Sequence, residues 1–475
     1  MISVKSKNIT WFVLATVFIA FIYSLIGRPI HIDDAWLGEY SYWWAQLGYV
    51  KSEALRGYFG AENKLFVYHK LFAQQGGLLI RATEFNVYIL KALPLAYLCL
   101  AFILGFLFFK KWMSTLSLCL LFILVLCFHQ IVGLSFTFRP EIPVMFFGML
   151  AAYFLIREEK TEKKFIFISA FFAAIAAANH LNGMVYIGAG VLYLWIQKKW
   201  LQGFIYGVIG FFGVCYYFID VRSLEDLKTL HLQFTNWRDV AGEKVGLLQL
   251  PLRVLREQER FFHTPPEIAY SLLLLTSLFV YFNEKIGSFH KETYRLLLYA
   301  ALVTFCLSIL AHGKSTKYIV YAVPFFMAFI VLVCQYARRG KMAILVVGSL
   351  YVLTNLIYNF NAFKGAPLFS HEIEYAAKQI PAGANVAAHY PYIFLGIPLG
   401  QKVQATVIYE DMERAKVLPP TAEDFFEQAA KFNIDYALIQ AEDRAQFHIA
   451  YEKVGQYEPI YRGEQDSVWL FRRIR

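Results

Sequence analysis

The sequence predicts a mainly α-helical protein, a polytopic membrane helix bundle of about eleven spans with a small external α/β domain at its C-terminal end. Three observations predict this class. Of 475 residues, 58% are hydrophobic and 17% are charged, whereas soluble domains have roughly 45–50% apolar and about 25% charged residues. Long apolar runs recur between residues 10 and 358, and after about residue 360 the composition becomes mixed. These features exclude a water-soluble enzyme, a disordered chain and a coiled coil.

Each predicted span rests on its length and composition. A membrane-spanning helix needs roughly 17 to 25 mainly apolar residues. The runs that meet or approach this length are 10–27, 88–109, 114–132, 141–156, 165–179, 183–197, 202–219, 267–282, 294–311, 318–337 and 341–358. The first run lacks a cleavage motif and is followed by Arg28-Pro29, so we expect it to be retained. All six cysteines lie in apolar runs, which predicts buried thiols and neither disulfides nor zinc ligands.

Positive charge in the loops predicts the orientation. Basic clusters occupy the short breaks at residues 5–7, 110–111, 157–164, 198–199, 285–295 and 338–341. Lys and Arg mark cytoplasmic loops, and eleven spans with a cytoplasmic N-terminus place every cluster on that side. The net charge of +10 therefore reflects topology, and no nucleic-acid partner is expected. We predict a multi-pass protein of the bacterial inner membrane whose functional residues lie on the outer side.

Two domains follow from this organisation. Residues 1–360 would form the transmembrane domain, with outer loops 28–87 and 220–266, and residues 361–475 a periplasmic α/β domain. In the latter, residues 371–380 read as a helix and 384–389 as a strand. A capping box at Thr421 is expected to open a helix through Asn433, followed by strands at 434–440 and 467–471.

The first outer loop carries two adjacent carboxylates, Asp33 and Asp34, directly after the first span. Trp36, Tyr40, Trp43, Trp44 and Leu47 then share one face at helical spacing. This pattern predicts an interfacial helix that lies along the membrane surface. The carboxylates would lie at its N-terminus beside a lipid-accessible site, although they could equally serve only to cap the helix and complement its dipole.

Further ionisable residues gather on the same predicted side. Arg139 and Glu141 stand between two spans, where ionisable residues usually face a cavity or a partner; the alternative is an ion pair that stabilises a turn. His180, near Asn182, marks the next outer turn as either a hydrogen-bonded turn residue or a substrate contact.

Two lysines, Lys314 and Lys317, precede a late span. They could extend toward the membrane surface or bind a lipid phosphate. The surrounding Gly-Lys-Ser-Thr stretch lacks the earlier glycine and the strand of a P-loop, so nucleotide chemistry is unsupported.

Together these residues resemble the GT-C class of membrane glycosyltransferases, in particular bacterial relatives of protein mannosyltransferases and of the lipid A aminoarabinose transferase. That family carries an acidic pair followed by an A-x-x-L-x-x-G-like helix, here residues 33–35 and 45–48. The Arg-Pro-Glu turn at 139–141, the Lys-x-x-x-Tyr pattern from Lys317 and the C-terminal tail are also similar. The family's Lys-Pro-Pro segment is replaced here by residues 68–71, in which Lys70 keeps the positive charge.

The resemblance implies transfer of a sugar, with inversion, from a polyprenyl-phosphate donor to a lipid, glycan or protein acceptor at the outer face of the membrane. Asp33 would be the general base, and Asp34 would tune its pKa, position the sugar or help to bind a divalent cation, the one cofactor left open. Residues expected to bind the lipid phosphate are Lys70, Arg139, Lys314 and Lys317, and those expected to contact substrate are His69, Glu141, His180 and Asn182.

Two other functions remain open from the sequence: a transporter or flippase of lipid-linked glycans, and a non-catalytic envelope assembly protein. Transporters usually show internal repeats and polar residues near the middle of the membrane, whereas the ionisable residues here gather toward one side. The sequence does not specify the sugar, the acceptor, the length of the lipid or the oligomeric state.

Overall fold

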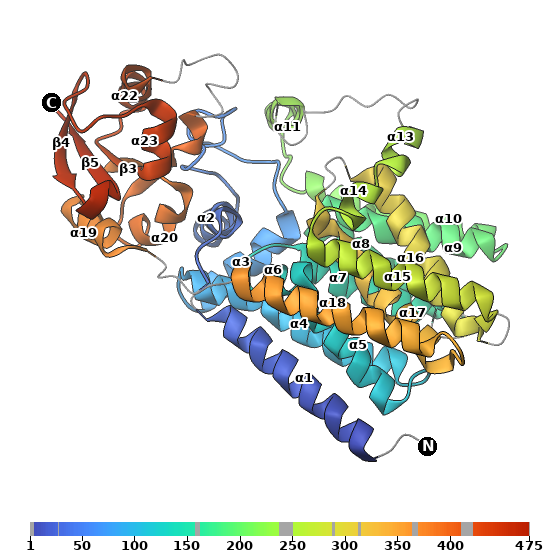
Figure 1. The fold of residues 1–475 in the computed structure, drawn as a ribbon. Coiled ribbons are helices and arrows are strands. Elements are labelled where there is room, and N and C mark those ends of the chain that lie inside the picture. Colours follow the sequence, from blue (N-terminus) through green and yellow to red (C-terminus); the bar gives the residue numbers. More distant parts are fainter. Residues whose placement is uncertain are drawn as a thin grey trace.

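A helix bundle with a small sheet domain at one end makes up the computed structural model (Figure 1). The structure describes residues 4–26, 28–156, 162–236, 250–286, 290–311, 315–362, 369–409 and 421–474. The predicted fold class, a mainly α membrane bundle with a C-terminal α/β domain, is confirmed.

The main helices of the bundle coincide with the predicted apolar runs. They are α1 (Val4–Leu25), α4 (Val87–Phe109), α5 (Thr115–Cys127), α7 (Glu141–Ile156), α8 (Lys163–Asn179), α9 (Met184–Ile196), α10 (Trp200–Cys215), α15 (Pro265–Asn283), α16 (Lys291–Leu310), α17 (Val323–Tyr336) and α18 (Lys341–Ala362). Within the described ranges, five helices (α4, α10 with its extension to Phe218, α15, α16 and α18) are long and apolar enough to cross a membrane, and a bent pair makes a sixth. Shorter apolar helices include α7 and α17. The chain is thus a multi-pass membrane protein, and the total of eleven spans stays a prediction.

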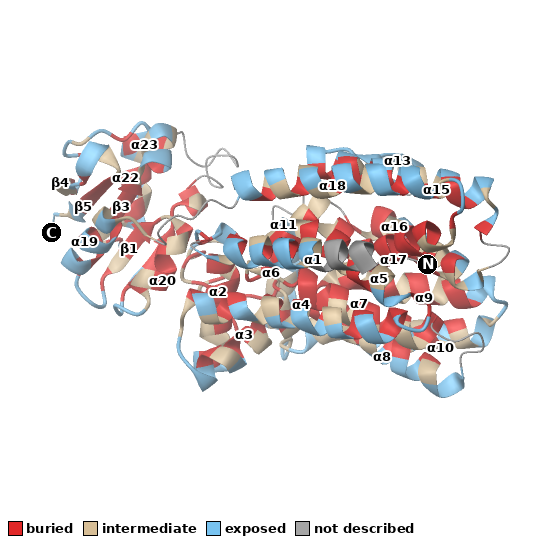
Figure 2. Cartoon of the chain, turned by 60° about the horizontal axis from the view of Figure 1, so that its bottom comes forward, coloured by how far each residue is buried: buried red, intermediate tan, exposed pale blue. Residues whose placement is uncertain are grey.

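The central helix of the bundle is α17, in which every residue from Val323 to Cys334 is buried. Peripheral helices instead expose large apolar side chains such as Phe211 on α10 and Phe360 on α18, as lipid-facing surfaces do. Figure 2 shows exposed residues along the outward sides of α1 and α18. The prediction of six buried cysteines is wrong for Cys99 and Cys215, which lie on exposed faces of α4 and α10; all six thiols are free, as predicted.

The run 114–132, predicted as one continuous helix, is broken after Cys127. Helix α6 (His129–Ser135) leaves α5 at an angle of 70°. Two asparagines of α18 satisfy the backbone groups that the break frees: Asn355 Oδ1 accepts from His129 N at 3.0 Å, and Asn359 Nδ2 donates to Cys127 O at 2.9 Å. Because an apolar environment offers no water for such groups, these contacts fix the direction of α6.

Two helices cover the end of the bundle nearest the sheet domain, α2 (Ile32–Leu47) and α3 (Lys70–Ala82). They pack closely: a side chain at Gly77 would lie 2.4 Å from the Trp44 ring. Helix α2 is the helix that the sequence predicts after the acidic pair. Most of its aromatic face packs against protein, and Tyr40 is fully buried, because α3 and the loop after α2 cover this face. Helix α2 ends at Gly48, whose φ of +77° suits glycine.

The C-terminal domain is built on a five-stranded sheet with strand order β2-β1-β3-β5-β4. Its main elements are α19 (His371–Gln379), β1 (Asn385–Ala388), β2 (Lys402–Ala405), α22 (Ala422–Lys431), β3 (Tyr436–Gln440), α23 (Ala441–Phe447), β4 (Tyr457–Arg462) and β5 (Val468–Arg473). Strands β1, β2 and β3 are parallel, and β5 pairs antiparallel with β3 and β4. The helices and strands predicted for the tail are present, and Thr421 caps α22 as expected.

The loop after α2 attaches this domain to the bundle. Ala405 N, on the edge strand β2, donates to Ala54 O at 2.9 Å, and Gln404 Nε2 donates to Arg56 O at 2.8 Å. The sheet domain thus lies against the segment that follows the predicted catalytic helix.

Candidate active site

The two adjacent carboxylates at the start of α2, Asp33 and Asp34, have different partners. His31 is the N-cap: its Nδ1 accepts from Asp33 N at 3.1 Å, while Asp34 Oδ2 accepts from His31 N at 2.8 Å. The side chains of His31 and Asp34 therefore cap the helix. The carboxylate of Asp33 points to other partners.

Asp33 lies among cationic and polar donors from three parts of the chain. Its Oδ2 pairs with Arg139 Nη1, lies 3.3 Å from Lys317 Nζ and 2.9 Å from His31 Nδ1, and its Oδ1 accepts from Trp36 Nε1 at 3.1 Å. Burial alone would raise the pKa of Asp33, but the charges of Arg139 and Lys317 outweigh it and lower that pKa. Without substrate, Asp33 is a carboxylate.

Arg139 joins Asp33 to the start of α7. Its guanidinium pairs with both oxygens of Glu141, with Nη2 to Oε1 at 2.5 Å, and the Glu141 side chain is fully buried. A planar guanidinium suits such two-point recognition of a carboxylate. The sequence left two interpretations of Arg139 and Glu141 open, an ion pair that stabilises a turn and a pair of site residues. The structure is compatible with both, because one guanidinium bridges Glu141 and Asp33.

Asp34 is enclosed by protein. Lys91 Nζ on α4 lies 3.2 Å from its Oδ2, and Phe138 N donates to its Oδ1 at 2.5 Å. Since Phe138 precedes Arg139, this carboxylate ties the Arg139 turn to the start of α2. Both oxygens of Asp34 are thus engaged by the protein.

Two histidines form a stacked pair beside these residues. The rings of His69 and His180 have centroids 4.2 Å apart, and the edge of Tyr318 approaches His180 at 5.6 Å. His180 Nδ1 accepts from Asn182 N at 2.9 Å, so its proton lies on Nε2. Burial, aided by Arg139, lowers the pKa of His180 to about 3, and burial also lowers the pKa of His69. Both rings are neutral near pH 7.

Lys70 belongs to a separate cluster. Its fully buried side chain pairs with Asp220 Oδ2 at 2.6 Å, and Tyr68 OH donates to the same oxygen at 2.7 Å. Lys64 Nζ donates to Asp220 O at 2.9 Å and pairs with Asp226 at 3.0 Å. The cluster joins the start of α3 to the segment before α11 (Leu224–Asn236).

The structure thus brings four predicted residues into one ion-pair network: Asp33, Arg139, Glu141 and Lys317. His69 and His180 stack on each other, and the backbone N–H of Asn182 donates to His180. Lys70 is bound to Asp220, and Lys314 lies outside the described residues.

Sequence reasoning missed Lys91, which pairs with Asp34, and it also missed a second buried cation. Arg260, on α14 (Gln258–Phe261), has a fully buried side chain, pairs with Glu257 at 2.8 Å, donates to Ser315 O and lies over the Tyr318 ring at 5.5 Å. Its local sequence, Arg-Glu-Gln-Glu-Arg, reads as a solvated charged loop, so nothing in it distinguished this arginine.

For a divalent cation, the part of the chain that the structure describes contains no group of three or more His, Cys, Asp or Glu side chains placed to hold a metal. Asp34, the residue considered for this role, already has protein donors on both oxygens.

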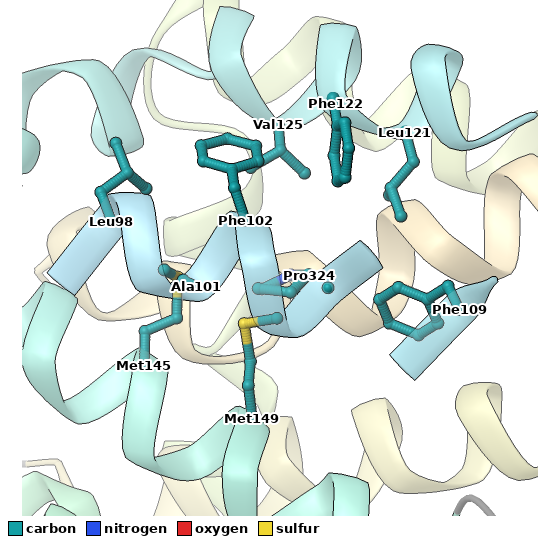
Figure 3. A pocket seen from close by; sticks show the side chains of 11 residues that line it. Leu98, Ala101, Phe102, Phe109, Leu121, Phe122, Val125, Met145, Met149 and Pro324 are labelled. Atoms are coloured by element: carbon teal, nitrogen blue, oxygen red, sulfur yellow. The ribbon is translucent and has the colours of Figure 1, made fainter. Parts of the chain in front are cut away.

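An apolar pocket lies within the bundle, and Figure 3 shows side chains that point into it. Its lining is Leu98, Ala101, Phe102, Gly105 and Phe109 of α4, Leu121, Phe122 and Val125 of α5, Met145 and Met149 of α7, and Pro324 of α17. At 1.5 Å per residue, Met145 and Met149 lie roughly 6 and 12 Å along α7 from Glu141. The lining of the pocket therefore begins about one helical turn beyond Glu141 and contains no residue of the ion-pair network.

Comparisons with known proteins rest on structure. No protein-family model matches the sequence, and no curated protein matches it. ArnT from Cupriavidus metallidurans, bound to undecaprenyl phosphate, matches with a TM-score of 0.65 and 10% identity over 99% of this chain and 98% of that chain. The archaeal oligosaccharyltransferase AglB from Archaeoglobus fulgidus, in complex with an inhibitory peptide and a dolichol-phosphate, gives a TM-score of 0.57 and 10% identity over 98% and 74%.

The arabinofuranosyltransferase AftD from Mycobacteria matches with a TM-score of 0.53 and 11% identity over 99% of this chain and 40% of that chain. These likenesses define the class of fold: the chain has the GT-C fold of membrane glycosyltransferases, as the sequence predicted. Among these three proteins, ArnT is the one whose whole length corresponds to this chain.

Proposed function

We propose that the protein is a glycosyltransferase that moves a sugar from a polyprenyl-phosphate donor to a lipid, glycan or protein acceptor, with inversion at the anomeric carbon. One observation carries the proposal: the Asp33 carboxylate is held between Arg139 and Lys317 at the end of the bundle. A carboxylate can accept a proton and the neighbouring cations can hold a phosphate, which are the two requirements of this transfer. The GT-C fold supports the same activity.

In the proposed reaction, Asp33 takes the proton of the acceptor hydroxyl. The acceptor oxygen attacks the anomeric carbon from the side opposite the phosphate, the bond between that carbon and the phosphate oxygen breaks, and polyprenyl phosphate leaves as an anion. Because phosphate leaves readily, no general acid is needed, unlike in glycosidases that pair an acid with a base.

The leaving phosphate needs positive charge. Arg139 and Lys317 are the cations next to Asp33, and Arg260 adds a third near Tyr318. Preorganised cations at a developing anion are commonly the largest catalytic contribution. Lys314 and Lys70 remain proposed phosphate contacts, and at Lys70 the phosphate would have to replace the Asp220 carboxylate.

Donor binding would also activate the base. Arg139 and Lys317 contribute to the low pKa of Asp33, and a carboxylate of low pKa is a weak base. A phosphate bound to the same cations shares their charge, so the pKa of Asp33 rises when the donor is in place. The enclosed Asp34 fits the role of holding and tuning this arrangement better than direct contact with sugar or metal.

The remaining parts have proposed places in substrate binding. The apolar pocket beyond Glu141 has a volume of about 30 Å³, so a polyprenyl chain would enter this part of the bundle only if the lining side chains moved apart. The neutral rings of His69 and His180 offer a flat surface and hydrogen-bonding nitrogens to a sugar, with Asn182 beside them. Glu141, being buried, would act on substrate by orienting Arg139.

For the cellular setting, we propose the bacterial inner membrane, with the N-terminus in the cytoplasm and the site on the periplasmic side. The basic loops support this orientation. The division into a transmembrane domain, residues 1–360, and a periplasmic domain, residues 361–475, follows the change in composition and the end of α18 at Ala362.

The test is a transfer assay with purified protein in detergent, a panel of radiolabelled polyprenyl-phosphate sugars, and envelope lipid or envelope protein as acceptor. We expect label to move from one donor to the acceptor, with the opposite anomeric configuration in the product by NMR. Retained configuration would overturn the single-displacement mechanism. Failure of every donor, together with movement of lipid-linked glycan across proteoliposomes, would favour a transporter instead.

A further inference from the structure

A partly buried amide on α6, that of Gln130, connects the core of the bundle to the segment that carries Lys317. Gln130 Nε2 donates to Glu267 Oε1 at 2.8 Å and to Thr316 Oγ1 at 2.9 Å. Glu267 is fully buried in the first turn of α15 and also accepts from Thr264. Both N–H groups of the Gln130 amide thus have acceptors, which fixes the orientation of the side chain.

The segment that Gln130 reaches needs such support. Lys317 lies on a 3-10 helix (Thr316–Tyr321), a form with poorer hydrogen-bond geometry than an α-helix. Two neighbouring residues are held from different helices: Ser315 O accepts from Arg260 of α14, and Thr316 Oγ1 accepts from Gln130 of α6. These are the two positions directly before Lys317, whose Nζ lies 3.3 Å from Asp33.

The position of Gln130 is fixed in turn by the break between α5 and α6. Asn355 and Asn359 of α18 bind the backbone on both sides of that break, at His129 N and Cys127 O. His129 Nδ1 also lies 2.9 Å from Asn359 Oδ1. A continuous set of polar contacts therefore runs from α18 through α6 to Thr316.

We propose that Gln130 and Glu267 are positioning residues, which set the place of Lys317 beside Asp33 through Thr316. This inference rests on the proposed function, because Lys317 is there a phosphate-binding cation. Glu267 supplies the acceptor that holds the Gln130 amide, and Gln130 supplies the donor that holds Thr316. A displacement of about 1 Å at a reacting group can lower a rate by about 100-fold, so a group that touches no substrate can still matter strongly.

The first test exchanges the two side chains. Gln130→Glu places two carboxylates against each other and removes the donor to Thr316, so transfer should fall by about tenfold or more. Adding Glu267→Gln restores an amide–carboxylate pair, and the Thr316 hydroxyl can then donate to the new carboxylate. We expect the double variant to recover most of the lost activity. No recovery in a double variant that folds would overturn the proposal.

The second test asks whether Gln130 acts through Lys317. Gln130→Leu and Lys317→Ala should each lower kcat/KM for the donor, and the double variant should be no worse than Lys317→Ala alone. If the two losses multiply, the residues act independently and the proposal fails. Gln335→Leu is the matched control. Gln335 lies near the C-terminal end of α17, the end far from Lys317, and its amide also joins two segments: it accepts from Ser117 Oγ at 2.6 Å and donates to Trp112 O at 3.2 Å.

A third measurement needs no substrate. Hydrogen exchange of the backbone amides of residues 315–321 should be about tenfold faster in Gln130→Leu than in the wild type. Gln335→Leu should leave exchange in this segment unchanged. Unchanged exchange in Gln130→Leu would remove the anchoring role even if transfer fell. If the wild type transferred no sugar, the proposed function would fail while this measurement still decided whether Gln130 holds the segment.

Discussion

The ion pairs around Asp33 at the end of the bundle are buried, whereas an ion pair of arginine and aspartate in the C-terminal domain is exposed. The side chains of Asp33, Arg139 and Glu141 are 10%, 13% and 0% exposed and form one network. In the C-terminal domain the pair of Arg462 and Asp466 is 55% and 31% exposed, above a core of apolar side chains. Buried ion pairs are weak evidence of a stability role, because desolvation offsets their attraction. The contrast fits the proposal that the chemistry takes place at the bundle end and that the C-terminal domain contributes packing.

The largest effect is expected where the network is broken. Arg139→Ala leaves Glu141 and Asp33 buried without their shared cation, which typically costs about 3–5 kcal/mol. Both the unfolding temperature in detergent and the transfer rate should fall steeply. Arg139→Lys keeps the charge but loses the two-point pairing, so it should unfold close to the wild-type temperature and still transfer poorly. Wild-type transfer by the lysine variant would contradict the geometric role of the guanidinium.

A pH effect is expected at the seam between the two regions. Glu39 on α2 is fully buried and accepts from Ser52 Oγ and from the backbone of Glu53 and Ala54, the loop that contacts the sheet domain. Burial raises its pKa to about 7. An unfolded chain has a glutamate pKa of about 4.3, so the native state binds this proton more tightly.

The contribution of Glu39 to the free energy of unfolding is therefore fully present below about pH 4.3. It is lost as the pH rises from there through about 7, and the change is of order 3 kcal/mol. Glu39→Gln keeps the shape and should flatten this part of the pH dependence. The measurement is the unfolding temperature of both proteins between pH 5 and 8. Parallel curves for the two proteins would show that Glu39 does not titrate in this window.

A smaller effect is expected at the cluster in which Lys70 pairs with Asp220. If the donor phosphate replaces the Asp220 carboxylate at Lys70, then Asp220→Asn removes a competing charge and should lower KM for the donor several-fold, on the order of 1 kcal/mol. Asparagine still accepts from Tyr68 and Lys70, but it leaves the buried Lys70 without its carboxylate, so the unfolding temperature should fall as well. A raised KM would indicate that Asp220 holds Lys70 in place and that phosphate binds elsewhere.

The smallest effect belongs to the C-terminal domain. Thr421 Oγ1 accepts from Asp424 N at 3.3 Å at the start of α22. Thr421→Ala should cost about 1 kcal/mol of stability, typical of a lost N-cap, and leave transfer unchanged. Thr421→Ser is the matched control. A large loss of transfer in the alanine variant would mean that this domain takes part in the reaction.

Much of this arrangement could be predicted from the sequence because it depends on local pattern. Apolar run length predicted the helices, and charge at the predicted outer ends selected Asp33, Arg139, Glu141 and Lys317, which the structure places in one network. From the residues alone, Asp33 could be a helix cap or a site residue, and the resemblance selected it as the base; in the structure His31, and not Asp33, is the N-cap.

What the sequence did not reveal depends on distant partners. No proline or glycine marks the break after Cys127, which is held by side chains more than 200 positions away. The pairing of Lys70 with Asp220 spans 150 positions, and Arg260 finds its partners at Ser315 and Tyr318 only in the folded chain. Pairwise contacts of this kind have no periodic signature in a single sequence.

The central claim, that chemistry depends on Asp33 and not on acidic residues in general, is tested most directly by transfer rates of two matched variants. Asp33→Asn and Asp466→Asn each neutralise an aspartate that is paired with arginine. We expect Asp33→Asn to fold and to lose about 100- to 10,000-fold in kcat, as for removal of a general base, while Asp466→Asn keeps the wild-type rate. Equal rates in both variants would contradict the assignment of Asp33 as the base.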